Sequence, residues 1–394
     1  MGIGHTHEPV GTVPVSERTV RVLHVVVVVI VAATLLGVVL LWPSDRDDPR
    51  DPFGLASDPV AAHVQRVAEQ PCSYDATSTC DLITSSITEG ERSGEVFTLE
   101  QPAGGGSPLG TGDDILVLAT DLGDGTVSWS FYDHQRSTPM WVLVVVFAVA
   151  IIALGRWRGL GALAGLAVSL LVLAGFMLPS ILDGHPAVLV ALVASSVIAC
   201  LALYLAHGFH PATSVALVST FAALVVTGLL SWWFVRLASF TGFTDEGSQF
   251  LTALGVPIDA RGILLAGIVI GSLGVLDDVT VTQVAAVWEL RTTDPGMERT
   301  ELVRRALRIG RDHISSTVNT LFLAYAGASL PLLLLFTEAG QGIGDIATRE
   351  VVAVEIVRSL VGSIGLVSAV PISTWLAALV LRPTSTPVPL PAEP

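Results

Sequence analysis

The sequence predicts an all-α polytopic membrane bundle of about eight transmembrane helices, with a small extracytoplasmic β-rich domain after the first helix. Three numbers indicate the membrane class. Of the 394 residues, 51% are hydrophobic and only 14% are charged, whereas soluble domains carry about 25% charged residues. The mean hydropathy is +0.68. An acidic stretch of short alternating segments, placed between apolar runs, predicts the β-rich domain.

The charge and the motif content exclude several classes of function. The formal net charge is -15, and a nucleic acid partner would require a basic face. The zinc-protease pattern H-E-x-x-H, the P-loop and the G-x-S-x-G elbow are all missing from the sequence. We therefore predict no enzymatic activity, no cofactor and no metal site.

The chain is expected to begin with a cytoplasmic tail, 1–21, and a transmembrane anchor, 22–42. The anchor is an apolar run long enough to span a bilayer of roughly 30 Å, and Arg18 and Arg21 precede it. Its end, Leu40-Leu41-Trp42-Pro43, shows no small-x-small cleavage site. We therefore expect an anchor that is not removed as a signal peptide.

Residues 43–138 are expected to form an acidic β-rich domain outside the cytoplasm. Between Ser44 and Ser137 there are seventeen Asp and Glu residues against five Arg. Short strands are predicted at Glu95–Leu99, Ile115–Thr120 and Thr126–Tyr132, with Asp and Gly turns between them. The length suits a domain of OB or SH3-like size.

Cys72 and Cys80 lie in this acidic stretch, separated by seven residues. A pair with this spacing and no accompanying Cys or His is a weak zinc signature. Outside the cytoplasm a disulfide is the better interpretation. It would also help a domain with a small hydrophobic core.

Residues 139–381 are expected to form a seven-helix membrane domain, followed by a cytoplasmic Pro-rich tail, 382–394. The predicted spans are 139–155, 159–180, 187–206, 212–235, 262–288, 314–336 and 351–381. Eleven arginines in the tails and short loops fall on one side of this arrangement, and four fall on the other. Because positive residues stay in the cytoplasm, we expect both termini inside a bacterial plasma membrane.

The span 262–288 carries unusual polar residues. Gly267, Gly271, Gly274 and Asp278 share one helical stripe with Thr282, and small residues at this spacing permit close helix packing. Asp278 is therefore expected in a tight helix interface near mid-membrane. Asp277 lies about 100° around the helix, so a paired-carboxylate site is not predicted.

The next span has a matching stripe that ends at Gly327. The two helices are expected to run antiparallel through a 24-residue cytoplasmic connection, which brings their polar groups to similar depths. Charged groups in membranes usually face a partner or a water-filled cavity. The predicted ion or solute pathway comprises Asp278, Asp277, Thr282, Gln283, Asn319 and Thr320. The predicted helix-packing residues are Gly267, Gly271, Gly274 and Gly327.

A further acid, Glu355, lies in the last span, one helical turn from Arg358. A local salt bridge between them is the favoured interpretation. The same span contains Pro371, which is a candidate for a kink.

Several blocks resemble the YibE/F family of bacterial multi-pass membrane proteins. The blocks are Gly271-x-x-Gly274-x-x-x-Asp278, Gly310-Arg311-Asp312 and Thr317-x-Asn319-Thr320-Leu321, with weaker similarity at Tyr132-Asp133-x-x-Arg136 and Pro179-Ser-Ile-Leu-x-Gly184. Asp278 matches the aspartate of the family, whereas Asp277 stands where an apolar residue is expected. The resemblance implies a membrane protein and no particular biochemical activity.

Two functions remain open at this point. The first is a transporter of an ion or small solute that uses Asp278 as its proton or cation site. The second is an envelope assembly or signalling protein in which the β-rich domain binds a protein partner and the polar core only holds helices together. The lipid bilayer is the one partner that both hypotheses share.

Overall fold

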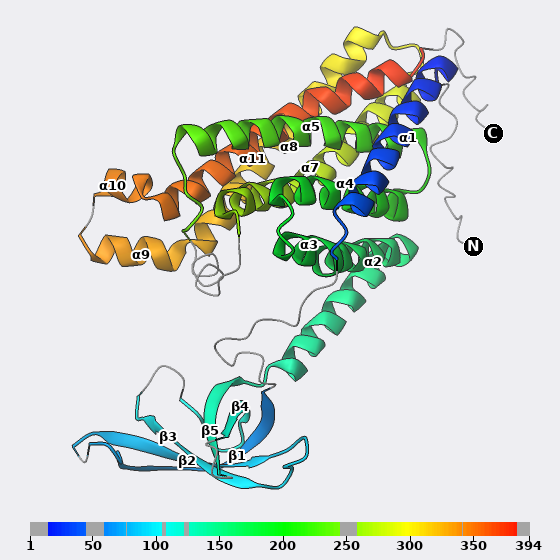
Figure 1. Ribbon diagram of the computed structural model, residues 1–394. Coiled ribbons are helices and arrows are strands. Elements are labelled where there is room, and N and C mark those ends of the chain that lie inside the picture. Colours follow the sequence, from blue (N-terminus) through cyan, green and yellow to red (C-terminus); the bar gives the residue numbers. More distant parts are fainter. Residues whose placement is uncertain are drawn as a thin grey trace, which may run out of the picture. The chain divides into compact units, whose positions relative to one another are not determined.

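The computed structural model describes residues 15–44, 59–75, 77–104, 108–121, 126–244, 258–340 and 342–383 (Figure 1). Residues 47–151 form one compact unit, and the described residues before and after it form a second. Most of the two expected tails, 1–21 and 382–394, lies outside the described residues.

The first unit contains one antiparallel sheet. Its strands follow the order β3-β2-β1-β4-β5, and the sequence-predicted strands correspond to the last three in the chain. Two longer strands at the start of the unit were not predicted. The strands are β1 (Val60–Pro71), β2 (Thr79–Ile87), β3 (Val96–Pro102), β4 (Asp114–Asp121) and β5 (Val127–His134).

Alternating side chains from the strands form the core of this unit. Val64, Ile83 and Ile115 are almost completely buried, as expected when every second residue of a strand faces one side. Phe97 and Trp129 pack with ring centroids 5.1 Å apart, and this contact brings β3 and β5 together. The sheet is therefore curled around its core, and the unit extends past the expected boundary of 43–138 into the first part of α2.

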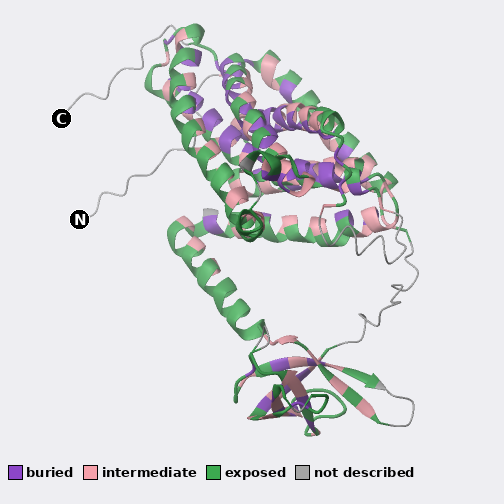
Figure 2. Ribbon diagram, turned by 90° about the vertical axis from the view of Figure 1, so that its left-hand side faces the viewer, coloured by how far each residue is buried: buried purple, intermediate pink, exposed green. Residues whose placement is uncertain are grey.

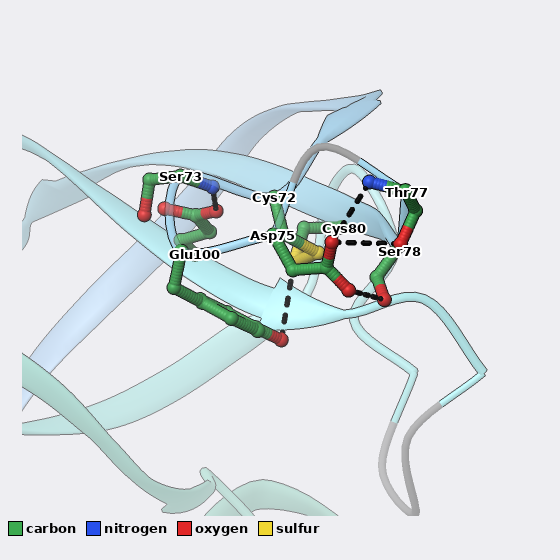
Figure 3. Close-up of a disulfide and its surroundings, with 8 residues drawn as sticks. Cys72, Ser73, Asp75, Thr77, Ser78, Cys80 and Glu100 are labelled. Atoms are coloured by element: carbon green, nitrogen blue, oxygen red, sulfur yellow. Dashed lines mark hydrogen bonds between the residues drawn. A yellow bond between two sulfur atoms is a disulfide. The ribbon is translucent and has the colours of Figure 1, made fainter.

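A disulfide joins Cys72 at the end of β1 to Cys80 in β2 (Figure 3). The loop between them is held by Asp75, whose carboxylate accepts hydrogen bonds from the Thr77 amide at 3.0 Å and the Ser78 hydroxyl at 2.7 Å. These bonds, together with one from the Thr77 hydroxyl, lower the pKa of Asp75. Glu100 accepts a 2.6 Å hydrogen bond from the Ser73 amide, which lowers its pKa as well.

The second unit is helical. Seven of the described helices are long and apolar enough to cross a membrane, or eight if the bent pair α8 and α9 counts as one span, which agrees with the predicted number. The elements are α1 (Glu17–Leu40), α2 (Ser137–Val172), η1 (Leu173–Met177), α3 (Leu178–Leu182), α4 (Ala187–His207), α5 (Pro211–Leu237), α7 (Ala260–Thr293), α8 (Arg299–Ala328), α9 (Leu330–Glu338), α10 (Ile343–Thr348) and α11 (Glu350–Val380).

Two candidate spans begin in the long helix α2. The first is Ser137–Trp157, and the second, Gly159–Leu182, continues through η1 and α3. They are separated by a kink at Arg156, where φ is 51°. None of the most apolar residues in the first span is buried within the chain, as the exposed colouring of that part of α2 shows (Figure 2). An apolar helix without protein partners is suited to contact with lipid tails.

Helix α7 lies against α4, α5, α8 and α11. The main core is rich in small residues, including Ala191, Ala194, Ala223 and Ala369, all of which are fully buried. Without a hydrophobic driving force between helices in lipid, close packing over small residues holds such bundles together. Because one side of α7 packs against these helices, its opposite side faces away from the bundle core.

Two predicted features of the later helices require correction. The expected 24-residue connection after α7 is largely helical, because α7 continues to Thr293 and α8 begins at Arg299. The single span 314–336 is instead broken between α8 and α9 by a 59° bend. Pro331 explains the break, because proline has no amide hydrogen to continue the helical hydrogen bonding. By contrast, α11 passes Pro371 without being split.

The start of the first described helix, α1, lies next to the end of the last one, α11. Val15 pairs with Leu381 in a short antiparallel bridge, and the Ser16 amide donates a 2.9 Å hydrogen bond to the Val380 carbonyl. The start of α1 and the end of α11 thus lie on the same side of the bundle.

Candidate functional site: the polar face of α7

The two faces of α7 have opposite character. Leu273, Leu276, Val279 and Thr280 are buried in the bundle, whereas the predicted polar stripe is exposed along its whole length. The exposed residues are Gly267, Gly271, Gly274, Asp278, Thr282, Ala285 and Glu289.

The prediction that Asp278 lies in a tight helix interface is therefore wrong. The valine, leucine and alanine side chains on the opposite face offer more apolar contact area, and they take the packed positions. Apart from their own stretch of helix, Gly274 and Gly327 have no atom of the described chain within 4 Å of the place where a Cβ would stand. They do not act as packing residues within this chain.

Gly267 and Gly271 do approach other helices. The Tyr325 hydroxyl of α8 lies 3.3 Å from the Cβ position of Gly271, and Nη2 of Arg358 from α11 lies 4.0 Å from that of Gly267. At the other end of the pair, Oε1 of Gln283 lies 2.8 Å from the Cβ position of Gly310 in α8. These contacts fix α7 and α8 as antiparallel neighbours.

The same contacts set the level of Asp278 relative to α8. Asp278 lies about 10 Å along α7 from Gly271 and about 8 Å from Gln283, at 1.5 Å rise per residue. The corresponding stretch of α8, between Tyr325 and Gly310, contains several exposed polar residues, among them Ser316, Asn319 and Thr320. We call Asp278 and Thr282 of α7, together with Ser316, Asn319 and Thr320 of α8, the open polar face.

The side chains of the open polar face retain hydrogen-bonding capacity. The Thr282 hydroxyl donates to the Asp278 carbonyl at 2.9 Å, and the Thr320 hydroxyl donates to the Ser316 carbonyl at 3.0 Å. Each hydroxyl oxygen still has lone pairs to offer. No described residue donates a hydrogen bond to the Asp278 carboxylate.

Asp277 has different surroundings from Asp278. It is half-buried, and its Oδ1 atom is buried without a hydrogen-bond partner among the described residues. Its neighbour Thr280 bonds to Thr220 of α5 at 2.7 Å. As expected, the two carboxylates do not share a face.

Gln283 does not belong to the open polar face, contrary to its predicted place in the pathway. The side chain is buried, and its Nε2 donates to the Ala306 carbonyl at 2.9 Å and to the Thr374 hydroxyl at 2.7 Å. Gln283 thereby links α7, α8 and α11. Its position one residue beyond Thr282 turns it by about 100° toward the packed side.

A second polar cluster lies at the Gly267 end of α7. Arg358 and Glu355 of α11 form the expected salt bridge, with Nη1 and Oε1 2.9 Å apart. The guanidinium carbon of Arg358 lies 6.0 Å from the ring centre of Tyr325. The salt bridge is predictable from the sequence because its partners lie one helical turn apart. The contacts with Tyr325 and Gly267 are not, because they join helices that are distant in the chain.

The first unit contains one group with metal-ligating atoms close together among the residues described, formed by Cys72, Cys80 and Glu100. Both cysteine sulfurs are used in the disulfide. Cysteine binds zinc only as a thiolate, so Cys72 and Cys80 cannot serve as zinc ligands while they form the disulfide.

Comparison with known proteins bears on the helical unit. The model of the YibE/F-like protein family matches residues 143–383, which include the open polar face and the Arg358 cluster. Neither the curated proteins nor the solved structures give a match. Since the family model covers more than half of the chain, this multi-pass membrane protein belongs to the YibE/F-like family.

Proposed function

We propose that the chain transports an ion or small solute across the membrane, with Asp278 as the proton or cation site. The observation that carries the proposal is the exposure of Asp278 in the middle of a membrane helix whose opposite face is packed. An aspartate at the centre of a membrane helix costs about 2.5–3.5 kcal/mol on insertion scales. The Asp278 carboxylate does not link helices within the described part of the chain. It is therefore suited to binding a proton or cation.

The neighbours of Asp278 support this assignment. Asn319, Thr320 and Thr282 offer amide and hydroxyl groups at similar depth, and these are suitable ligands for a hydrated cation or a polar solute. A face of this kind favours water over lipid tails. Asp277 is the second acid nearby. Its Oδ1 has no hydrogen-bond partner among the residues that the structure describes, which makes it a candidate to share a proton or cation with this pathway.

The test is ion flux in proteoliposomes loaded with a pH-sensitive dye or, in a parallel preparation, a Na⁺-sensitive dye, with a potassium gradient and valinomycin to set the potential. We expect the wild type to carry protons or Na⁺, Asp278→Asn to lose flux about tenfold or more, and Asp278→Glu to retain part of it. Glu289→Gln is the matched control, because Glu289 is exposed on the same stripe near the end of α7.

Wild-type flux that survives Asp278→Asn unchanged would remove Asp278 from the pathway. A wild type that conducts neither protons nor Na⁺ would overturn the ionic form of the proposal. Correct insertion of each variant is checked by the elution of a folded protein in size-exclusion chromatography.

The orientation belongs to the same proposal. The distribution of arginines among the loops supports an orientation with both termini in the cytoplasm of a bacterial cell and the β-rich unit outside. Under this proposal, transport requires no catalytic residue and no cofactor.

An assembly or signalling role is the alternative, and one observation favours it. Tyr74 is 70% exposed on the loop that the Cys72–Cys80 disulfide ties down. Exposed tyrosines are frequent in protein interfaces. Under this alternative, Tyr74→Ala abolishes function in cells, while Asp278→Asn only lowers stability.

A further inference from the structure

Arg358 has donor groups that its ion pair leaves unused. Nη1 is engaged by both carboxylate oxygens of Glu355, at 2.9 and 3.2 Å. Nε is buried and has no acceptor among the described residues, and Nη2 is directed toward Gly267. One edge of the guanidinium, formed by Nε and Nη2, therefore has no acceptor among the described residues, and only its Nη2 end is not buried.

An unused donor of this kind requires an explanation. A buried polar group without a partner costs about 1–3 kcal/mol, and a charged group costs more. Most such groups in native structures are satisfied by protein, water or an ion. The Tyr325 ring lies on one side of Arg358, but an aromatic face does not replace a hydrogen-bond acceptor for Nε.

Tyr325 adds a second donor at the same place. Its hydroxyl lies against Gly271, and none of the described residues forms a hydrogen bond with it. Gly267 and Gly271 lack side chains and leave their surface exposed between Arg358 and Tyr325. Three helices thus contribute to one small site: α7 its glycines, α8 the hydroxyl and α11 the guanidinium.

We propose that this site binds an oxyanion, a carboxylate or a phosphate group. Nη2 of Arg358 can donate a charge-assisted hydrogen bond to an oxygen of such a group, and the Tyr325 hydroxyl is available for a second contact. The glycines admit the ligand because a Cβ at Gly267 or Gly271 would narrow the space. Oxyanion binding at this site does not require Asp278. If the oxyanion is part of a transported solute, that role rests on the proposed function.

Glu355 gives the proposal its sharpest consequence. Its carboxylate neutralises Arg358 and competes with an incoming anion. Removing it by Glu355→Gln should strengthen oxyanion binding, by about tenfold at the separation of neighbouring charges. If the salt bridge is purely structural, Glu355→Gln should not strengthen oxyanion binding. Glu355→Gln and Arg358→Gln should then lower the free energy of unfolding by similar amounts.

The experiment is equilibrium dialysis of labelled acetate and labelled phosphate against the full chain in phosphatidylcholine nanodiscs. We expect saturable binding by the wild type, loss of binding in Arg358→Gln, and about tenfold weaker binding in Arg358→Lys, since lysine lacks the planar fork. Tyr325→Phe keeps the ring and should weaken binding several-fold. Arg349→Gln is the matched control, because Arg349 also stacks on an aromatic ring, Phe336, at 4.9 Å.

Two sources of oxyanion are separated by the lipid. If the ligand is the headgroup of an anionic lipid, phosphatidylglycerol discs should suppress acetate binding, and the wild type but not Arg358→Gln should retain that lipid in native mass spectrometry. If the ligand is a solute, acetate binding should be equal in both discs.

The proposal is overturned if the wild type binds neither probe in phosphatidylcholine and retains no anionic lipid, or if Glu355→Gln fails to strengthen binding. Asp278→Asn distinguishes this failure from failure of the transport proposal. It should leave oxyanion binding unchanged while it abolishes flux.

Discussion

The neighbouring aspartates Asp277 and Asp278 have different surroundings, because each residue along a helix is turned by about 100° from the one before it. Asp277 points partly into the bundle, and its Oδ1 has no donor in the described part of the chain. Asp278 points away from the bundle, toward the same side as Thr282. A substitution at either position therefore perturbs a different surface of α7, and the two changes should not be treated as equivalent.

At the same scale, the Asp75 loop of the β-rich unit should loosen in acid. The folded pKa of Asp75 is lowered by hydrogen bonds from Thr77 and Ser78, so their stabilisation is fully present above the ordinary aspartate pKa of about 3.9. It is lost as the pH falls through the lower, folded value. Hydrogen exchange of the full chain should show the amide of Thr77 exchanging faster at low pH than expected from the intrinsic rate.

Asp75→Asn is the companion variant for this measurement. It removes the titrating group, so the extra acid sensitivity of the loop should disappear. Acid sensitivity that is unchanged in Asp75→Asn would assign the effect to another carboxylate, of which Glu100 is the nearest candidate, because its pKa is also lowered.

At the scale of elements, α5 and α11 meet where Gly365 lies against Thr227. A Cβ added at Gly365 would overlap the Thr227 hydroxyl, which itself donates to the Ala223 carbonyl at 2.9 Å. Gly365→Ala should therefore lower the free energy of unfolding by about 1–3 kcal/mol, the usual range for overpacking. The midpoint of unfolding of the purified chain, in detergent of increasing SDS content, measures the change.

Thr227→Ala should recover part of this loss, because it removes the atom that the new Cβ meets. Gly228→Ala is the control: it has nothing within 4 Å of its Cβ position and should be neutral or mildly stabilising, since alanine favours helix. Equal losses in Gly365→Ala and Gly228→Ala would mean that backbone freedom, rather than close packing, decides the effect.

The elements also show how far the sequence predicts this fold. Apolar length identifies the spans, since a bilayer requires about twenty apolar residues regardless of neighbours. Periodicity identifies the stripe from Gly267 to Glu289, but it cannot tell which stripe faces a partner. The opposite stripe, with Leu273 and Leu276, is the packed one. That choice depends on α4 and α5, which lie far away in the chain.

The missed elements have similar causes. Strands β1 and β2 contain charged and small residues among the apolar ones, and they are stabilised by pairing with each other and with β3 and β4. The first half of α8 is polar, and its helix is supported by Glu301 with Arg305 and by burial of Leu302 and Ala306. Such contacts depend on the tertiary fold and are invisible to a hydropathy profile.

At the scale of the whole molecule, the ends of the described chain come together through the Val15–Leu381 bridge. This contact requires the start of α1 and the end of α11 to lie on one side of the membrane, which an even number of crossings provides. The bend between α8 and α9 matters here, because the count is even only if that pair crosses once.

The side on which the ends lie is the last prediction. In a chain with Cys200 replaced by Ala, a cysteine at Thr300 should be protected from a membrane-impermeant maleimide in intact cells, because the arginine-rich region at the start of α8 is expected inside. A cysteine at Glu338, an exposed residue at the end of α9, should react. If the bent pair does not cross, both positions should give the same result. If the whole orientation is reversed, Thr300→Cys should react and Glu338→Cys should be protected, and the β-rich unit would then lie in the reducing cytoplasm, where its Cys72–Cys80 disulfide is not expected to persist.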